Sequence, residues 1–327
     1  MALCLRRWMA GPLPAAALAA TLAVAGVPAP AGADFLSGVV AYQARDYERA
    51  RQEFLAPDTV HIPLAKAYLG RLFLLGRGGE RDGTIGRRFL DEAVAVDLPE
   101  AIVFLAQVLE QGHFLPQDTE TAVTLWRRGA ELGIANAQNA LARRLLEGDG
   151  VAQDYAEARR WLLAAAAQND ASAMTSLGYL AEQGLGEPAD VAKAETYYRK
   201  AVLRGHPTAL NNLAWLLAGQ KRSLKEAESF ARRAVDDLPT ATTMDTLGFV
   251  LLQQGRAAEA LIHLDRAALL SPENWQVQEH LGDAHWQLGN VLAARAAWAK
   301  AQKLAEDAGV DQRLDGKIAG ELSGELH

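Results

Sequence analysis

Acidic side chains gather between residues 147 and 154, where the chain reads EGDGVAQD. Glu147, Asp149 and Asp154 surround two glycines there, and carboxylate oxygens around a tight turn are the ligands that calcium prefers. A calcium loop also needs a bidentate glutamate at a fixed distance, which this stretch lacks. The loop is therefore a metal site, a phosphate-binding turn or a bend between two helices, and the pattern around it has to decide between them.

Histidines and acids also gather in EHLGDAHW, residues 279–286. Glu279, His280, Asp283 and His285 are of the residue types that bind zinc. On one helix, however, these positions are distributed around the axis and do not converge on a single ion. We therefore predict packed or solvated histidines here, and no metal.

Sequence motifs of common enzymes are absent. The chain has no G-x-S-x-G, no H-E-x-x-H and no Walker loop. The stretches GRGGER at 76–81 and GLGEPA at 184–189 follow helices, whereas a dinucleotide-binding fingerprint follows a strand. We predict a non-enzymatic protein with no catalytic residue, no cofactor and no metal ligand.

An internal repeat of 36 residues positions these loops. Alanine recurs once in each unit, leucine stands four residues later, and a small residue follows the leucine. Glycine and aspartate then recur at fixed distances from the alanine. The alanines are Ala65, Ala101, Ala137, Ala173 and Ala209, the glycines are Gly76, Gly112, Gly148 and Gly184, and the aspartates are Asp82, Asp118, Asp154 and Asp190. A period of this length is typical of repeat architectures.

The spacing within each unit predicts a helical hairpin. Alanine and leucine four residues apart mark one face of the first helix, and the small residue lets a neighbouring helix approach closely. The glycine ends the first helix and the aspartate caps the second, for which Asp154 and Glu157 could form a capping box. The buried face of the second helix is predicted from Ala122, Ala158 and Ala194, followed by Trp126, Trp161 and Tyr197. The loop at 147–154 is thus predicted to be a bend.

Beyond Ala209 the period shortens to 34 residues, as the positions of Leu213, Leu247 and Leu281 show. Before the first 36-residue unit, GVVAYQARDYERARQEF at residues 38–54 predicts one further hairpin. The predicted fold class is all-α: an α-solenoid of about eight helix-turn-helix hairpins, followed by a polar tail that could fold as a capping helix.

The first 33 residues have the three parts of a secretory signal. Arg6 and Arg7 supply the positive start, residues 13–27 are rich in alanine, leucine and valine, and a small-x-small pattern ends at Ala33. Cleavage there would make Asp34 the first mature residue, and an uncleaved anchor is the alternative. We predict a periplasmic or secreted protein.

The charge and the cysteine content of the chain limit the kinds of partner and attachment that it can have. The formal net charge of −7 argues against nucleic-acid binding, which needs clustered lysine and arginine. Cys4 is the only cysteine, and because it precedes the apolar stretch it is not the lipid-accepting cysteine of a lipoprotein. The mature chain would have no disulfide, and no later apolar run is long enough for a transmembrane segment.

These motifs resemble two related repeat families. The 36-residue units resemble Sel-one-like repeats, most clearly in AQNALARRLLEGDGVAQDYAEARRWLLAAA, although the loops GRGGERD and GHFLPQD lack the G-x-G-V form. The 34-residue units, such as DTLGFVLLQQGRAAEALIHLDRAALLSP, resemble tetratricopeptide repeats (TPRs). The resemblance implies an α-solenoid that binds proteins or peptides on its concave side. Exported bacterial members are similar to envelope scaffolds, assembly factors and periplasmic regulators.

The resemblance also divides the chain. We expect a signal peptide at 1–33, an N-terminal TPR-like hairpin at 34–64, Sel-one-like repeats at 65–208, TPR repeats at 209–305, and a tail or capping helix at 306–327. A cysteine-rich Sel-one-like subgroup has been linked to β-lactam binding or hydrolysis, but its paired cysteines are missing from the mature chain.

Inward positions of the first helices supply the candidate binding residues. The register puts successive aromatic residues on this surface, with asparagines that could hydrogen-bond a peptide backbone. The candidates are Tyr179, Trp215, Phe249, Trp286, Asn139, Asn211, Asn212 and Asp283. The alternative is that the aromatic residues only pack between hairpins. The acids Asp245, Glu279 and Asp283 would suit a ligand of basic character. The absence of inward lysine or arginine in the last units disfavours a ligand with a free C-terminal carboxylate.

The predicted function is that of a protein- or peptide-binding scaffold or adaptor in the cell envelope. One alternative is a periplasmic regulator that restrains a membrane sensor kinase. A lower alternative is a hydrolase acting on cell-wall or β-lactam substrates. The partner and the oligomeric state stay open.

Overall fold

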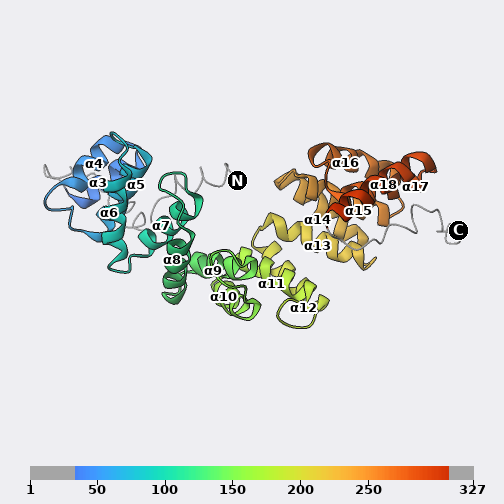
Figure 1. Ribbon diagram of the computed structural model, residues 1–327, viewed down its shortest axis with the longest axis horizontal. Coiled ribbons are helices and arrows are strands. Elements are labelled where there is room, and N and C mark those ends of the chain that lie inside the picture. The colour runs from blue at the N-terminus through green and yellow to red at the C-terminus, as the bar shows by residue number, and fades with distance from the viewer. Residues whose placement is uncertain (1–33, 309–327) are drawn as a thin grey trace, which may run out of the picture. The chain divides into compact units, whose positions relative to one another are not determined.

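The computed structural model describes residues 34–308. The regular elements within that range are sixteen α-helices, which follow one another as pairs joined by short turns (Figure 1). Eight hairpins result, which confirms the all-α repeat fold predicted from the two sequence periods. The signal peptide predicted at 1–33 and most of the tail predicted at 306–327 lie outside the described residues.

The chain divides into two compact units, with the boundary after Gln168. The first unit holds α3 (Phe35–Gln43), α4 (Tyr47–Leu55), α5 (Pro63–Leu75), α6 (Gly83–Val94), α7 (Pro99–Gln111), α8 (Thr119–Glu131), α9 (Ala135–Glu147) and α10 (Tyr155–Ala167). The second unit holds α11 (Ala171–Gln183), α12 (Val191–Leu203), α13 (Pro207–Gly219), α14 (Leu224–Asp237), α15 (Ala241–Gln253), α16 (Ala257–Leu270), α17 (Trp275–Gln287) and α18 (Val291–Asp307). None of these helices is both long and apolar enough to cross a membrane.

The recurring glycine and aspartate shape each turn as predicted. Gly148 ends α9 in the left-handed conformation with φ 70°, and its N–H donates to the carbonyl of Arg144. Asp154 then caps α10 by accepting a hydrogen bond of 2.8 Å from the backbone N–H of Glu157. At the same positions of the other three turns, the left-handed glycines are Gly76, Gly112 and Gly184, and the capping aspartates are Asp82, Asp118 and Asp190.

The capping box predicted at this turn is wrong. The carboxylate of Glu157 does not return to the start of α10; it accepts hydrogen bonds from Arg127 at 2.5 Å and from Nε1 of Trp161 at 3.1 Å. The pairing with a positively charged guanidinium on α8 is the stronger interaction, because charge-assisted bonds exceed neutral ones. Glu157 therefore links two consecutive hairpins.

Small residues let the two helices of a hairpin touch. A Cβ atom added to Gly178 would lie 2.5 Å from Cε1 of Tyr198, and one added to Gly282 would lie 2.3 Å from Cδ1 of Trp298. The large side chain of the second helix thus fills the space left by the glycine. This packing confirms the reason predicted for the small residue after each leucine.

The predicted buried face of the second helix is correct for the alanines, but it is off by one residue for two of the aromatic side chains. Trp126 is 2% exposed and Tyr198 is fully buried, and both stand four residues after the repeat's alanine. Trp161 and Tyr197 stand three residues after it and are only half-buried. A spacing of four keeps a side chain above the alanine on the same face, whereas a spacing of three turns it toward the rim.

Candidate binding surface

First helices of the second unit lie next to one another, since α13 contacts α15 and α15 contacts α17. They bring together Trp215, Phe249 and His280, which we call the aromatic cluster. The ring centroids of Trp215 and Phe249 are 4.5 Å apart, those of Phe249 and His280 are 4.9 Å apart, and those of Trp215 and His280 are 5.6 Å apart. Trp215 and Phe249 remain partly exposed, whereas His280 is 6% exposed.

A polar pair lies beneath the two larger rings. Nδ1 of His280 is 2.8 Å from Oδ1 of Asp245, and both side chains are about nine-tenths buried. Burial disfavours the charged imidazolium, but the carboxylate of Asp245 outweighs it and raises the pKa of His280, with Asp283 and Glu279 adding to the attraction. A protonated His280 also neutralises the carboxylate of Asp245.

Asparagine side chains extend the surface along α13. Asn211 is 7% exposed, stands one helical turn before Trp215, and its Oδ1 atom has no hydrogen-bond partner in the structure. Its Nδ2 atom lies 3.5 Å from Oδ1 of Asn212, which is a long contact for a hydrogen bond. A buried amide that lacks a partner retains its capacity to bind a polar group of a ligand.

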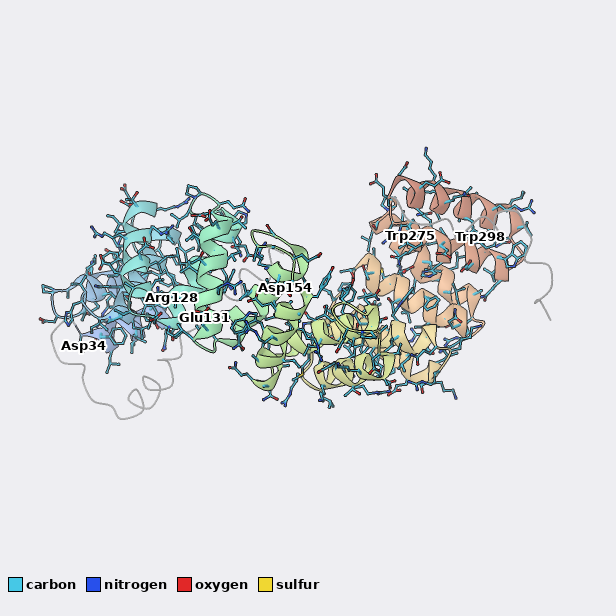
Figure 2. All side chains as sticks on the ribbon, turned by 60° about the horizontal axis from the view of Figure 1, so that its bottom comes forward. Asp34, Arg128, Glu131, Asp154, Trp275 and Trp298 are labelled. Atoms are coloured by element: carbon cyan, nitrogen blue, oxygen red, sulfur yellow. The ribbon has the colours of Figure 1, made fainter. Side chains whose placement is uncertain are left out.

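Two candidate residues contact the second helix of the last hairpin and are partly buried. Asp283 accepts a hydrogen bond of 2.9 Å from Nε1 of Trp298, and the rings of Trp286 and Trp298 are 5.5 Å apart. Trp298 comes from α18 and is 1% exposed; Figure 2 labels it on the last hairpin together with Trp275. Trp286 therefore packs against the second helix of its own hairpin rather than against the aromatic cluster.

Tyr179 and Asn139 lie elsewhere. Tyr179 on α11 is 48% exposed, and no aromatic pair within residues 34–308 includes its ring. Asn139 is on α9 in the first unit, where it is half-buried. In the first unit, Arg71 is 3% exposed and packs beside the ring of Phe104.

One half-buried carboxylate of the first unit joins three other side chains. Glu110 accepts a hydrogen bond of 2.6 Å from Arg143, pairs with Arg144, and accepts 2.9 Å from Nε1 of Trp126. Burial alone would raise the pKa of Glu110, but these hydrogen bonds and positive charges lower it. The network connects α7, α8 and α9, so it holds two consecutive hairpins together.

Both metal candidates have structural explanations. In the loop at 147–154, the carboxylate of Asp149 pairs with Arg144 and that of Asp154 caps α10. In α17, His280 bonds Asp245 and Asp283 bonds Trp298. Within residues 34–308, no group of three histidine, cysteine or acidic residues is placed to hold a metal ion.

A serine and a histidine meet at the start of the second unit. Oγ of Ser172 is 3.2 Å from Nε2 of His206, and Nδ1 of His206 is 3.0 Å from Oγ1 of Thr175. Burial lowers the pKa of His206, so the ring is neutral near pH 7. A hydrolase would orient Nδ1 with a carboxylate, whereas here a hydroxyl holds it, and the three side chains tie α11 to the start of α13.

Sequence reasoning placed Trp215 and Phe249 together and counted Asp245 among the acids of this surface, but it did not pair Asp245 with His280. The signal was available in the 34-residue period, because Asn211, Asp245 and Glu279 share one register position and Asn212, Thr246 and His280 share the next. If the first of these positions in one repeat contacts the second in the following repeat, then Asp245 meets His280.

Family models of two repeats match the chain. The model described as "Sel1 repeat" matches residues 63–95, 99–134, 135–170 and 171–206, and a model described as "Tetratricopeptide repeat" matches residues 189–242 and 246–309. Neither model describes a catalytic domain.

Solved bacterial structures share the fold. A Sel1 repeat protein from Oxalobacter formigenes is 24% identical, with a TM-score of 0.64 over 72% of this chain and 97% of that chain. A protective antigen present in uropathogenic Escherichia coli strains, which displays an SLR fold, is 21% identical, with a TM-score of 0.70 over 90% of this chain and 68% of that chain. At these identities the likeness concerns the fold alone.

Curated relatives resemble only part of the chain. The ERAD-associated E3 ubiquitin-protein ligase component HRD3A of Arabidopsis thaliana is 32% identical over 120 residues, which are 37% of this chain and 18% of the relative. HRD3B of the same plant is 34% identical over 83 residues, or 14% of its length. The matched part is therefore less than a fifth of either relative.

Proposed function

Because this chain is a Sel1-like and tetratricopeptide repeat protein, we propose that it is a non-enzymatic scaffold that binds a protein or peptide segment on the first helices of its second unit. The partly exposed rings of Trp215 and Phe249 carry the proposal. They form a contiguous aromatic surface above a buried polar pair, and aromatic anchors of this kind dominate many peptide-binding interfaces.

Polar groups beside the rings support an extended peptide as the ligand. The unpartnered Oδ1 of Asn211 and the amide of Asn212 lie within one helical turn of Trp215, where they can bond a peptide backbone. Tyr179 on α11 offers a further exposed ring, apart from the aromatic cluster. Asn139, Trp286 and Asp283 complete the set predicted from the repeat register.

We also propose that the ligand is basic, although fewer acidic side chains support this than the sequence indicates. Asp245 and Asp283 are hydrogen-bonded to His280 and Trp298, so their carboxylates offer less to a ligand than their number indicates. Glu279 is half-buried beside the same surface. We expect peptides with lysine or arginine next to an apolar residue to bind more tightly than acidic ones.

A peptide-library selection on the full chain tests the binding surface. We expect the double variant Trp215→Ala, Phe249→Ala to weaken binding of the selected peptides at least tenfold while helicity and the melting temperature stay close to wild type. Phe230→Ala is the matched control, since Phe230 is a half-buried aromatic residue on a second helix of the same unit. Undiminished binding by the double variant would place the ligand elsewhere, and a loss of helicity would assign both rings to the core.

The cellular setting is proposed from the N-terminal sequence. Arg6, Arg7 and the small-x-small pattern ending at Ala33 support export and cleavage, which makes the envelope the place of action. N-terminal sequencing of protein from a periplasmic fraction should begin at Asp34. Affinity capture from envelope extract, repeated with the purified partner, separates an assembly scaffold from a regulator that restrains a membrane sensor kinase.

Hydrolysis is a testable alternative because of the Ser172–His206 pair. Since Nδ1 of His206 is held by a hydroxyl, we expect no turnover of a chromogenic β-lactam or of cell-wall fragments. Turnover that disappears in Ser172→Ala would replace the scaffold by an enzyme.

A further inference from the structure

Three of the four turns in the 36-residue units have glycine at their third position. These glycines have positive φ values: 73° at Gly78, 71° at Gly150 and 79° at Gly186. The second turn, GHFLPQD at 112–118, has Phe114 there instead, and the backbone of Phe114 does not have a positive φ. The second turn therefore follows a different path from the others.

Glycine is needed where the turn touches the preceding hairpin. A Cβ atom at Gly78 would lie 2.1 Å from the carbonyl oxygen of Tyr47, at the start of α4. One at Gly150 would lie 2.5 Å from Cγ2 of Thr119, at the start of α8. In both cases the turn packs tightly against the first turn of the preceding hairpin's second helix.

The turn at 112–118 meets the start of α6 less closely, since a Cβ atom at Gly83 would lie 3.5 Å from Cδ2 of Leu115, and a cavity lies beside this contact. It has a volume of about 630 Å³ and is lined by Gly83, Thr84, Arg87, Leu109, Phe114, Leu115, Pro116, Gln117 and Asp118. This volume is within the range of small-ligand sites in proteins. The cavity lies wholly within the first unit.

Hydrogen bonds from both sides hold the turn in place. Nη2 of Arg81 donates to the carbonyl of Phe114 at 2.7 Å, and its guanidinium lies 5.5 Å from the centre of the Phe114 ring. Nε2 of Gln117 donates to the carbonyl of Glu110 at 3.2 Å. These contacts fix the wall of the cavity, so the site is preformed.

The lining combines an apolar wall with one cation. Leu109, Leu115 and Pro116 supply the apolar wall together with the ring of Phe114. Arg87 bonds Asp91 through Nε alone, at 2.8 and 3.0 Å, which leaves the two Nη atoms for a ligand.

The neighbouring acid is already in use. Asp118 directs its carboxylate to the backbone N–H of Thr121 at the start of α8, at 3.0 Å. Hydrogen bonds from the side chain and from the backbone N–H of Thr121, with the charge of Arg87 as a smaller contribution, lower the pKa of Asp118. The carboxylate of Asp118 keeps its negative charge and lines the same cavity, so the carboxylate of a ligand is attracted only where Arg87 is nearer to it than Asp118.

We propose that this cavity is a second binding site, which takes a carboxylate carried next to an apolar side chain, as at the C-terminal residue of a peptide. The carboxylate pairs with Nη1 and Nη2 of Arg87 beside the hydroxyl of Thr84, and the apolar side chain lies against Leu115 and Phe114. The site is independent of the aromatic cluster, which belongs to the other unit.

Titration of the full chain with N-acetyl-L-phenylalanine, followed by NMR, tests the site. We expect saturable shifts for residues of α6 and of the turn at 112–118, and at least tenfold weaker binding of N-acetyl-L-phenylalaninamide, which lacks the carboxylate. Arg87→Gln should lose that preference for the acid. Arg88→Gln, which changes an exposed neighbour that does not line the cavity, should keep it.

A variant that fills the cavity with a large side chain gives a second test of the site. Thr84→Trp puts a large side chain at an exposed position of the lining, so it should abolish binding while the circular dichroism spectrum stays unchanged. Equal affinity for the acid and the amide, full binding by Arg87→Gln or Thr84→Trp, or no saturable shift at all would each overturn the proposal.

Discussion

Nδ1 of His280 lies 2.8 Å from Oδ1 of Asp245, and the two side chains come from the first helices of consecutive hairpins. The pair is buried beneath Trp215 and Phe249, so it connects α15 to α17 and supports the proposed binding surface at the same time. Its charge state therefore affects both folding and the surface that a ligand meets.

The raised pKa of His280 predicts a loss of stability at higher pH. Burial opposes the charged ring, but Asp245 overcomes it, so the folded pKa exceeds the value of about 6.5 for an unfolded histidine. The stabilisation is complete below pH ~6.5 and is lost as the pH rises through the folded pKa.

The urea midpoint of the second unit should therefore fall over that range in the wild type more than in His280→Gln. The difference between the two proteins removes the contribution of His206, whose lowered pKa acts in the opposite direction. An NMR titration in which His280 deprotonates below pH 6.5 would contradict the prediction.

Helix contact within the last hairpin depends on Gly282. The variant Gly282→Ala should lower the free energy of unfolding by about 1–3 kcal/mol, because the new Cβ would lie 2.3 Å from Cδ1 of Trp298, which cannot move without disturbing its bond to Asp283. Gly219→Ala is the control, since no atom lies within 4 Å of its added Cβ. The control should be neutral or stabilising by up to about 1 kcal/mol in the same denaturation experiment.

The bend at 147–154 depends on a cap and not on a metal. Asp154→Ala should destabilise the first unit by about 1 kcal/mol, because it removes the acceptor for the N–H of Glu157. Asp154→Ser should restore most of that loss. A melting temperature that falls on addition of a calcium chelator would contradict this explanation of the loop.

Glu110 should stabilise the first unit at neutral pH. Replacing it by glutamine leaves Arg144, whose side chain is 7% exposed, with Asp149 as its remaining acidic partner, and should cost about 1–3 kcal/mol. Because the folded pKa of Glu110 is lowered, this stability is present above its unfolded value and is lost as the pH falls through the folded pKa. The gap in urea midpoint between wild type and Glu110→Gln should therefore narrow in acid; a constant gap would mean that packing, not charge, is responsible.

Sequence periodicity predicted the hairpins because each rule behind it is local. A left-handed turn favours glycine, and a helix start favours a side-chain acceptor three residues before one of its free N–H groups, so Gly148 and Asp154 identify a turn within seven residues. The same local rules could not distinguish Tyr197 from Tyr198, because both are aromatic and adjacent, and only the position of α11 decides which is buried.

The candidate surface was less predictable because it depends on contacts between hairpins. The repeat register placed Trp215 and Phe249 on one side, and their rings are in contact. It placed Trp286 on the same surface, but a ring at that position of α17 reaches Trp298 within its own hairpin. Whether a side chain reaches across to the next hairpin depends on helix crossing, which a period in sequence does not encode.

Every helix pair with extensive contact lies within one hairpin or between consecutive hairpins. A hairpin is therefore stabilised only by the hairpins next to it. Local unfolding that begins in one hairpin can extend to its neighbours or remain confined to part of the chain. Emission from Trp126 and Trp161 reports on the first unit, whereas emission from Trp215 and Trp298 reports on the second. Melting curves recorded by fluorescence and by circular dichroism should accordingly differ, because the stability of this protein is a profile along its length.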